Sequence, residues 1–214
     1  MEPATQLALI ALIVILVAAY IFFNYNAKPS SAIDAARARI SENLTKMRRL
    51  WTESSYLTRS SVVEGISGYL GANATNERIL ANANQVGRNL GNLYGSSNGD
   101  RFATLLRDRH LILQNVIVAA RQNKDFSDEA KKLKANTQEI VAFWTDINTT
   151  VDGKKLECLL DAHADHTLRK ITHISKQESI AGYNSFDSSN KTLQELMDYF
   201  DEITWKNLVG APRY

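Results

Sequence analysis

The sequence has one cysteine, three prolines and almost no excess of either charge. Because Cys158 is alone, no intramolecular disulfide can form, and packing must hold the fold, as suits a reducing compartment. The 25 basic and 23 acidic side chains leave a formal net charge of +2, and no basic cluster exceeds the pair Arg48 and Arg49. This balance gives no electrostatic reason to expect a nucleic-acid partner.

The sequence also lacks a complete catalytic motif. Gly65, Gly68 and Gly71 are irregularly spaced and follow a helical segment instead of a strand, unlike a phosphate-binding loop. His163 is offset around the helix from Cys158 and is poorly placed to act as its base, so we expect a buried, inert thiol. We therefore expect no catalytic residues, no cofactor and no small-molecule substrate, and predict that the protein is not an enzyme.

Long apolar runs are absent, with one exception near the amino terminus. Residues 7–23 are seventeen apolar or small residues without a charge, inside an uncharged run over residues 3–27. A helix of this length is roughly 25 Å long and approaches the roughly 30 Å of bilayer hydrocarbon. We predict a single transmembrane helix within residues 1–28. Its membrane-embedded side chains are expected to be Leu7, Leu9, Ile10, Leu12, Ile13, Val14, Ile15, Leu16, Val17, Tyr20, Ile21, Phe22 and Phe23.

A cleaved signal peptide is the alternative for this segment. Signal peptides begin with a basic region and carry a shorter apolar core, whereas this chain begins Met-Glu-Pro and stays apolar through Phe23. These features favour an uncleaved anchor. Lys28, Arg37 and Arg39 follow the span, so the positive-inside rule places the following domain on the cytoplasmic side or its equivalent.

Apolar side chains after the anchor recur at steps of three and four, the spacing of amphipathic helices. No convincing two-residue alternation occurs, so residues 29–210 are predicted to be an all-α domain, followed by a tail over residues 211–214. Helices are expected from about Ser30 to Leu70, from Thr75 or Asn76 to a turn at Gly95–Gly99, from Asp100, from Ser127, around Leu156–Ile174, and from about Ser188 to Gly210. Short loops between them indicate an antiparallel bundle.

The helix that begins at Asp100 is expected to be central, because its sequence is nearly continuously apolar over residues 110–120. The expected core of the bundle, taken from the apolar stripes, is Trp51, Leu106, Leu113, Ile117, Ile140, Trp144, Leu160 and Phe200.

The segment LWTESSYLTR, residues 50–59, resembles the LWxxHxxWTR-like element of a family of small all-helical proteins from Gram-positive bacteria and some large DNA viruses. The likeness continues through TNERILANANQVGRNLGNLYG, LLRDRHLIL, NTQEIVAFWTDIN, LLDAH, and SFD followed by LMDYFDEI, over about residues 46–209. The resemblance implies a helical fold. The family has no established activity to transfer.

In that family one histidine lies in each of three helices, and the matching positions here are Ser54, His110 and His163. The resemblance implies facing imidazoles, which could bind a transition metal within a bundle. Only two of the three remain, and a serine hydroxyl is a poor substitute ligand. We therefore expect no metal, and interpret His110 and His163 as core histidines hydrogen-bonded across helices.

His163, His166 and His173 share one helical face, because their spacings are three and seven. Lys170 lies on the same stripe, where a protonated amine would repel a metal ion. We therefore expect an exposed polar face instead of a metal site. If a metal does bind, His110, His163 and His166 are the candidate ligands.

An anchor joined to a bundle without a catalytic set favours an attachment role. With the family resemblance, this architecture is similar to what membrane-anchored minor capsid proteins of large icosahedral DNA viruses need to tether an internal lipid membrane to the protein shell. The expected partners are then the bilayer and other structural or capsid proteins, with the domain facing the cytoplasm or capsid. Two alternatives stay open: a metal- or small-ligand-binding bundle using His110 and His163, and a bacterial membrane-bound adaptor or sensor.

Overall fold

The computed structural model describes residues 15–20, 32–69 and 71–210, and the chain divides into two units, Met1–Ser41 and Glu42–Tyr214. In the first unit, residues 15–20 are helical. The rest of the predicted anchor, residues 7–14 and 21–23, and the predicted domain boundary at 28 and 29 lie outside the described residues. In the part of the chain that is described, no helix is both long enough and apolar enough to cross a bilayer.

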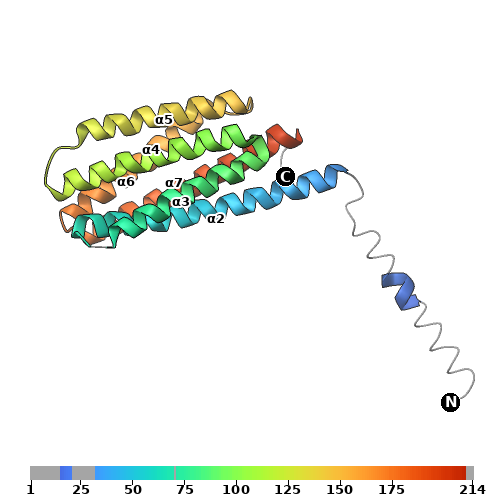
Figure 1. Cartoon of the computed structure of the whole chain (residues 1–214), viewed down its shortest axis with the longest axis horizontal. Helices are drawn as coiled ribbons and strands as arrows, with labels where there is room; N and C mark the ends of the chain where they lie inside the picture. The colour runs from blue at the N-terminus through green and yellow to red at the C-terminus, as the bar shows by residue number, and fades with distance from the viewer. Residues whose placement is uncertain (1–14, 21–31, 70, 211–214) are drawn as a thin grey trace, which may run out of the picture. The chain divides into compact units, whose positions relative to one another are not determined.

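The second unit is built from α-helices that run antiparallel to their neighbours (Figure 1). Consecutive helices from α3 to α7 contact each other, and α4 also contacts α6. The predicted all-α class and antiparallel bundle are confirmed, and the contacts of α4 with α3, α5 and α6 give it the expected central place. The helices are α2 (Ala32–Ser67), α3 (Ala72–Tyr94), α4 (Ser96–Arg121), α5 (Ser127–Ile147), α6 (Gly153–Ser175) and α7 (Ser179–Val209).

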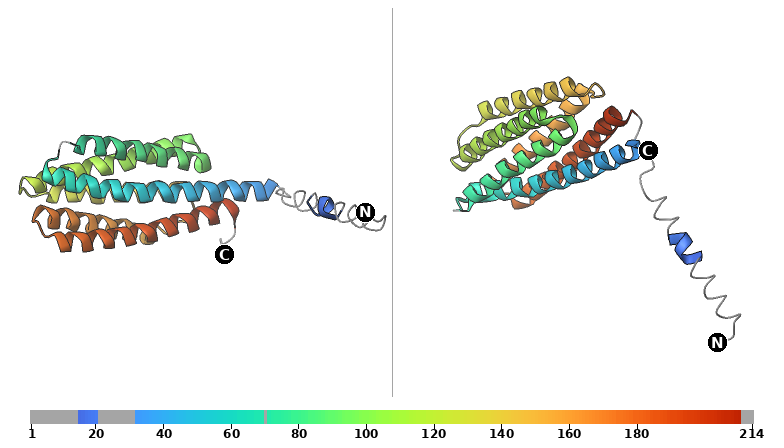
Figure 2. Two further views of the ribbon diagram at one scale, coloured as in Figure 1. Left: turned by 90° about the horizontal axis from the view of Figure 1, so that it is seen from below. Right: turned by 45° about the vertical axis from the view of Figure 1, so that its right-hand side comes forward.

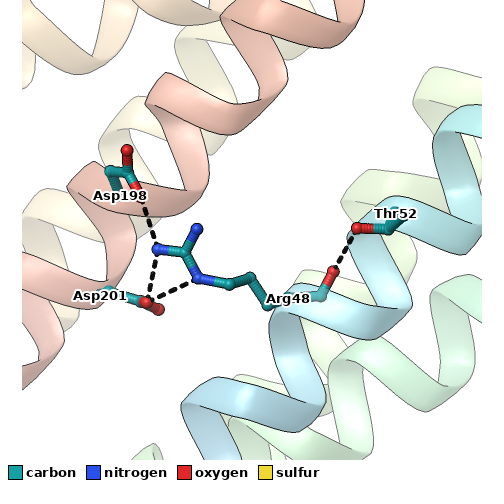
Figure 3. Close-up of polar contacts among 4 residues, drawn as sticks. All are labelled: Arg48, Thr52, Asp198 and Asp201. Atoms are coloured by element: carbon teal, nitrogen blue, oxygen red, sulfur yellow. Dashed lines mark hydrogen bonds and ion pairs between the residues drawn. The ribbon is translucent and has the colours of Figure 1, made fainter.

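Helix α2 lies between α3 and α7, as the two views of Figure 2 show. On the α7 side, Arg48 donates from Nε and Nη2 to Oδ2 of Asp201 at 3.0 and 2.7 Å, and from Nη2 to Oδ1 of Asp198 at 2.6 Å (Figure 3). The Asp201 side chain is only 7% exposed. Forked, charge-assisted pairing of this kind fixes the orientation of both partners, so Arg48 sets the register of α2 against α7.

On the α3 side, two asparagines bind the backbone of α2. Asn82 donates from Nδ2 to the carbonyl oxygen of Leu50 at 3.1 Å, and Asn89 donates from Nδ2 to that of Asn43 at 2.8 Å. Both asparagine side chains belong to buried residues. Because a buried amide without a partner is costly, these bonds favour one alignment of α2 against α3.

The predicted turn at Gly95–Gly99 is too long. Only Gly95 separates α3 from α4, and residues 96–99 form the first turn of α4. Gly95 has a φ of +91°, a conformation that side chains disfavour, and its N–H donates to the carbonyl oxygen of Gly91 at 2.9 Å. A single glycine in this conformation is enough to end one helix and begin the next.

Gly87 and Gly99 bring the backbones of α3 and α4 together. A Cβ atom added at Gly87 would lie 2.5 Å from the carbonyl oxygen of Gly99 and 2.6 Å from Cβ of Ala103. At Gly91, by contrast, the nearest atom to an added Cβ would be Cα of Ser96 at 3.4 Å, an ordinary contact. Close packing therefore depends on Gly87 far more than on Gly91.

Gly87→Ala is accordingly expected to lower the free energy of unfolding by about 1 to 3 kcal/mol, because α3 and α4 must move apart. Gly91→Ala, one turn away, is expected to be neutral or to raise it by up to about 1 kcal/mol, because alanine favours the helix. Urea unfolding followed by circular dichroism measures both values. Equal effects of the two substitutions would contradict the close contact at Gly87.

Helix α7 begins nine residues before the predicted start near Ser188. Residues 179–187 are rich in small and polar side chains, which are typical of loops, but Gly182 and Ser185 are buried. A Cβ atom at Gly182 would lie 3.1 Å from Cγ1 of Ile174. The small residues serve close packing of α7 on α6, which is why the sequence pattern was misleading here.

The core consists of two clusters of buried side chains. Six of the eight predicted core residues are buried: Leu113, Ile117, Ile140, Trp144, Leu160 and Phe200. Trp51 and Leu106 are half-buried and pack against the larger cluster. In that cluster the rings of Trp144 and Phe200 stack with centroids 4.7 Å apart. Cys158, in contrast to the prediction, is exposed on α6, so the expectation of a buried thiol is wrong.

Candidate functional site: a cavity at the centre of the bundle

A cavity of about 90 Å³ lies among α2, α3, α4, α5, α6 and α7. Most of its wall is apolar, with Trp51, Phe102 and Phe200 as the aromatic members. Ser54, His110 and His163, which match the three family histidine positions, all line this one cavity. The complete set of polar lining residues is Ser54, Thr58, Asn82, Arg109, His110 and His163.

His110, on α4, is buried and belongs to a network of side chains. Nε2 of Gln114 lies 3.4 Å from Nε2 of His110 and donates to Oγ of Ser61 at 2.7 Å. Ser61 donates to Oδ1 of Asn76 at 2.9 Å, and Asn76 returns a bond from Nδ2 to Oε1 of Gln114 at 3.0 Å. The network joins α2, α3 and α4, although the partner of His110 itself lies one turn along the same helix. Burial lowers the pKa of His110 to about 4, so the imidazole is neutral at pH 7.

His163, on α6, differs from the prediction of a hydrogen-bonded core histidine. It is half-buried, and its ring makes no hydrogen bond to any residue in the described ranges. Burial, together with the charges of Arg109, Lys170 and His166, lowers its pKa to about 3. A neutral imidazole therefore lines the cavity, with one N–H donor and one acceptor nitrogen.

Arg109, on α4, is the charged residue that lines the cavity, and it was not among the site residues predicted from the sequence. Its Nη1 donates to Oδ1 of Asn136 at 3.3 Å and to Oγ1 of Thr137 at 3.2 Å, and its Nη2 donates to the carbonyl oxygen of Leu160 at 3.4 Å. Burial lowers the pKa of Arg109 to about 10, and the charge of Asp161 opposes this only in part. The guanidinium stays charged at pH 7.

The sequence does carry an indication of this placement. Arg109 follows Leu106 by three residues and precedes Leu113 by four, so it lies on the apolar stripe of α4. Its position inside the run Arg107-Asp108-Arg109-His110 is typical of a solvated helix face. The periodicity therefore predicts that Arg109 faces the interior, whereas the local composition predicts that it faces solvent. The structure agrees with the periodicity, because Arg109 lines the cavity.

The prediction of an exposed polar face on α6 is wrong at the centre of that face, because Lys170 is only 2% exposed. Its Nζ lies 5.7 Å from the ring centroid of Phe186, a cation–π contact that accommodates the buried ammonium. Burial, and then the charge of Arg59, lower the pKa of Lys170 to about 8. His166 is half-buried, and His173 places Nδ1 2.6 Å from Oε2 of Glu178.

The chemistry of the cavity favours an anion over a metal ion. Among residues 15–20, 32–69 and 71–210, no three or more histidine, cysteine, aspartate or glutamate side chains are grouped to hold a metal. His110 and His163 share the cavity with Arg109, whose charge repels a cation, and His166 does not line it. No protein-family model, curated protein or solved structure matches the chain.

Proposed function

We propose that this protein is a non-enzymatic membrane-anchored attachment protein, held in a bilayer by residues 7–23 and presenting its helical bundle to other structural proteins. The observation that carries this proposal is the uncharged run over residues 3–27, in which the described helical residues expose large apolar side chains. Ile15 is 63%, Leu16 60% and Tyr20 71% exposed. Each such side chain gains about 1.5 to 3 kcal/mol on leaving water, which a bilayer supplies.

The packing of the bundle gives a second argument for the same proposal. Residues 42–210 bury their own apolar side chains in two clusters, so the fold has no need of the apolar amino-terminal segment. A segment that a fold does not require, and that water disfavours, is best explained by a separate role in attachment.

A more specific form of the proposal rests on the resemblance over residues 46–209. In this form the protein is a minor capsid protein that tethers an internal virion membrane to the protein shell. Lys28, Arg37 and Arg39 would then place the bundle on the capsid-facing side. A bacterial adaptor or sensor would use the same anchor and the same topology.

Deleting residues 1–28 is expected to abolish membrane attachment and to leave the fold unchanged. The full chain should float with lipid vesicles in a density gradient, whereas the truncated chain should stay at the bottom with the same helical circular dichroism. Ile13→Arg is a sharper variant, because a charge at the centre of a span costs about 2.5 to 3.5 kcal/mol of insertion free energy.

Glu2→Arg is the matched control, because it adds an arginine outside the apolar run. It should float like the unchanged chain. Equal flotation of the truncated and full chains would overturn the role of the anchor. Loss of helical structure on truncation would show that the segment belongs to the fold and is not a separate attachment device.

A further inference from the structure

The central cavity contains a positive charge that the protein itself neutralises poorly. All three hydrogen bonds of Arg109 to described residues go to neutral oxygen atoms at 3.2 Å or more, which is long for a charged donor. Nε makes no hydrogen bond to a described residue. Since a guanidinium has five N–H donors, at least two are left for another partner.

The carboxylate that acts electrostatically on Arg109 is engaged elsewhere. Asp161 is the acidic group whose charge acts on Arg109, but it forms an ion pair with Nζ of Lys134, which also pairs with Glu157 at 2.7 Å. Within the described ranges, no carboxylate lies at ion-pair distance from Arg109. Arg109 is half-buried, and a charge partly removed from water without a counter-charge is costly, so the site is suited to an anion.

The unused donors have the geometry that a carboxylate requires. Nε and Nη2 form one edge of the planar guanidinium, and this edge binds both oxygen atoms of a carboxylate in parallel. Nη1, on the other edge, is occupied by Asn136 and Thr137. The ring of His163, which has no hydrogen-bond partner among the described residues, adds a neutral N–H donor to the same cavity.

The volume of the cavity and the apolar side chains of its wall further limit the size and the chemistry of the ligand. At about 10 to 15 Å³ of void for each water-sized group, 90 Å³ holds roughly six to nine non-hydrogen atoms. The wall around the polar groups is apolar and aromatic, which suits a hydrocarbon body. The guanidinium of Arg109 carries one positive charge, and the two imidazoles are neutral. A ligand with a single negative charge is therefore balanced, whereas a phosphate dianion would keep an uncompensated charge.

From this arrangement we infer that the bundle binds a small monocarboxylate of six to nine non-hydrogen atoms, with its carboxylate on Arg109 and its apolar body among Trp51, Phe102 and Phe200. The site is separate from the proposed membrane attachment, and neither requires the other. It gives the chain a ligand in addition to the bilayer.

Benzoate and benzamide test this inference, because the two molecules share size and shape but only benzoate is charged. Titration calorimetry on the full chain in lipid nanodiscs, with empty nanodiscs as the blank, is expected to show one saturable benzoate site per chain. Benzamide should bind at least about tenfold more weakly, since charge-assisted hydrogen bonds are lost.

Arg109→Lys keeps the charge but removes the fork, and is expected to weaken benzoate binding by about tenfold or more. Arg101→Lys is the matched control on the same helix, because Arg101 is exposed, pairs with Asp146 and does not line the cavity. Its benzoate affinity should equal that of the unchanged chain. Circular dichroism establishes that both variants are folded.

Four results would overturn the inference: no saturable benzoate binding, equal affinity for benzamide, unchanged affinity in folded Arg109→Lys, or an equal loss in Arg101→Lys. If Arg109→Lys does not fold, the comparison of benzoate with benzamide on the unchanged chain decides alone. Flotation with vesicles does not depend on the cavity, so failure here leaves the attachment proposal standing.

Discussion

Replacing Trp144 by alanine is expected to lower the free energy of unfolding by about 3 to 5 kcal/mol. Trp144 is only 2% exposed, and its ring stacks on Phe200 and meets Phe102 and Tyr94 edge-on, with centroids 5.6 and 5.9 Å away. Alanine would remove all of these contacts and leave a void that rigid aromatic neighbours cannot fill. Urea unfolding followed by circular dichroism at pH 7 measures the loss.

Two variants make this measurement specific. Lys132 lies on the exposed face of the same helix, and Lys132→Ala is expected to lower the free energy of unfolding by under roughly 0.5 kcal/mol. Trp144→Phe should cost clearly less than Trp144→Ala, because Nε1 of Trp144 is buried without a hydrogen-bond partner among the described residues, and phenylalanine removes that donor. A loss below about 1 kcal/mol for Trp144→Ala would contradict its place in the core.

Lowering the pH from 7 to 5 is expected to destabilise the fold by on the order of 2 kcal/mol for each of His110 and His163. Their pKa values in the fold, about 4 and about 3, lie below the ordinary value of 6.5, so the unfolded chain takes up protons first as the pH falls. The full contribution is therefore present above about pH 6.5 and is lost below it. Urea unfolding at pH 7, 6 and 5 follows this loss.

A double replacement, His110→Gln with His163→Gln, separates the histidines from other titrating groups. Glutamine does not titrate, so the difference in stability between pH 7 and pH 5 should shrink by most of the expected amount. If the double variant keeps the full acid sensitivity, carboxylates carry it, and the two imidazoles are not the groups that acid attacks.

The sequence predicts the helices of this protein well where their apolar stripes are regular, as in α5, whose start at Ser127 is correct. The errors fall where small or polar residues have a packing role that local pattern does not reveal. Gly99 lies in a helix and packs against Gly87 of α3, and Gly182 lies in a helix and packs beside Ile174 of α6. Such contacts join residues distant in the chain, so a pattern confined to neighbours misses them.

The cavity was predictable only in part, for the same reason. The predicted resemblance to a helical family singled out Ser54, His110 and His163, and in the structure all three line one cavity. Arg109 escaped notice because its burial depends on Asn136 and Thr137 of α5, more than twenty residues further along the chain. From the sequence alone a charged side chain is predicted to be exposed, because the helix that packs against it is not known.

The way α2 is held has a mechanical consequence. From Glu42 onward α2 continues as one helix to Ser67, so the bonds that join this segment to α3 and α7 would resist a pull along its axis. The bonds from Arg48 to α7, and from Asn82 and Asn89 to α2, lie across that axis. They would be loaded together in shear, instead of opening one after another as in peeling. Bonds loaded together share the force, so the bundle resists a pull along α2 better than it would if the same bonds were loaded one at a time, a property that would serve the proposed attachment role.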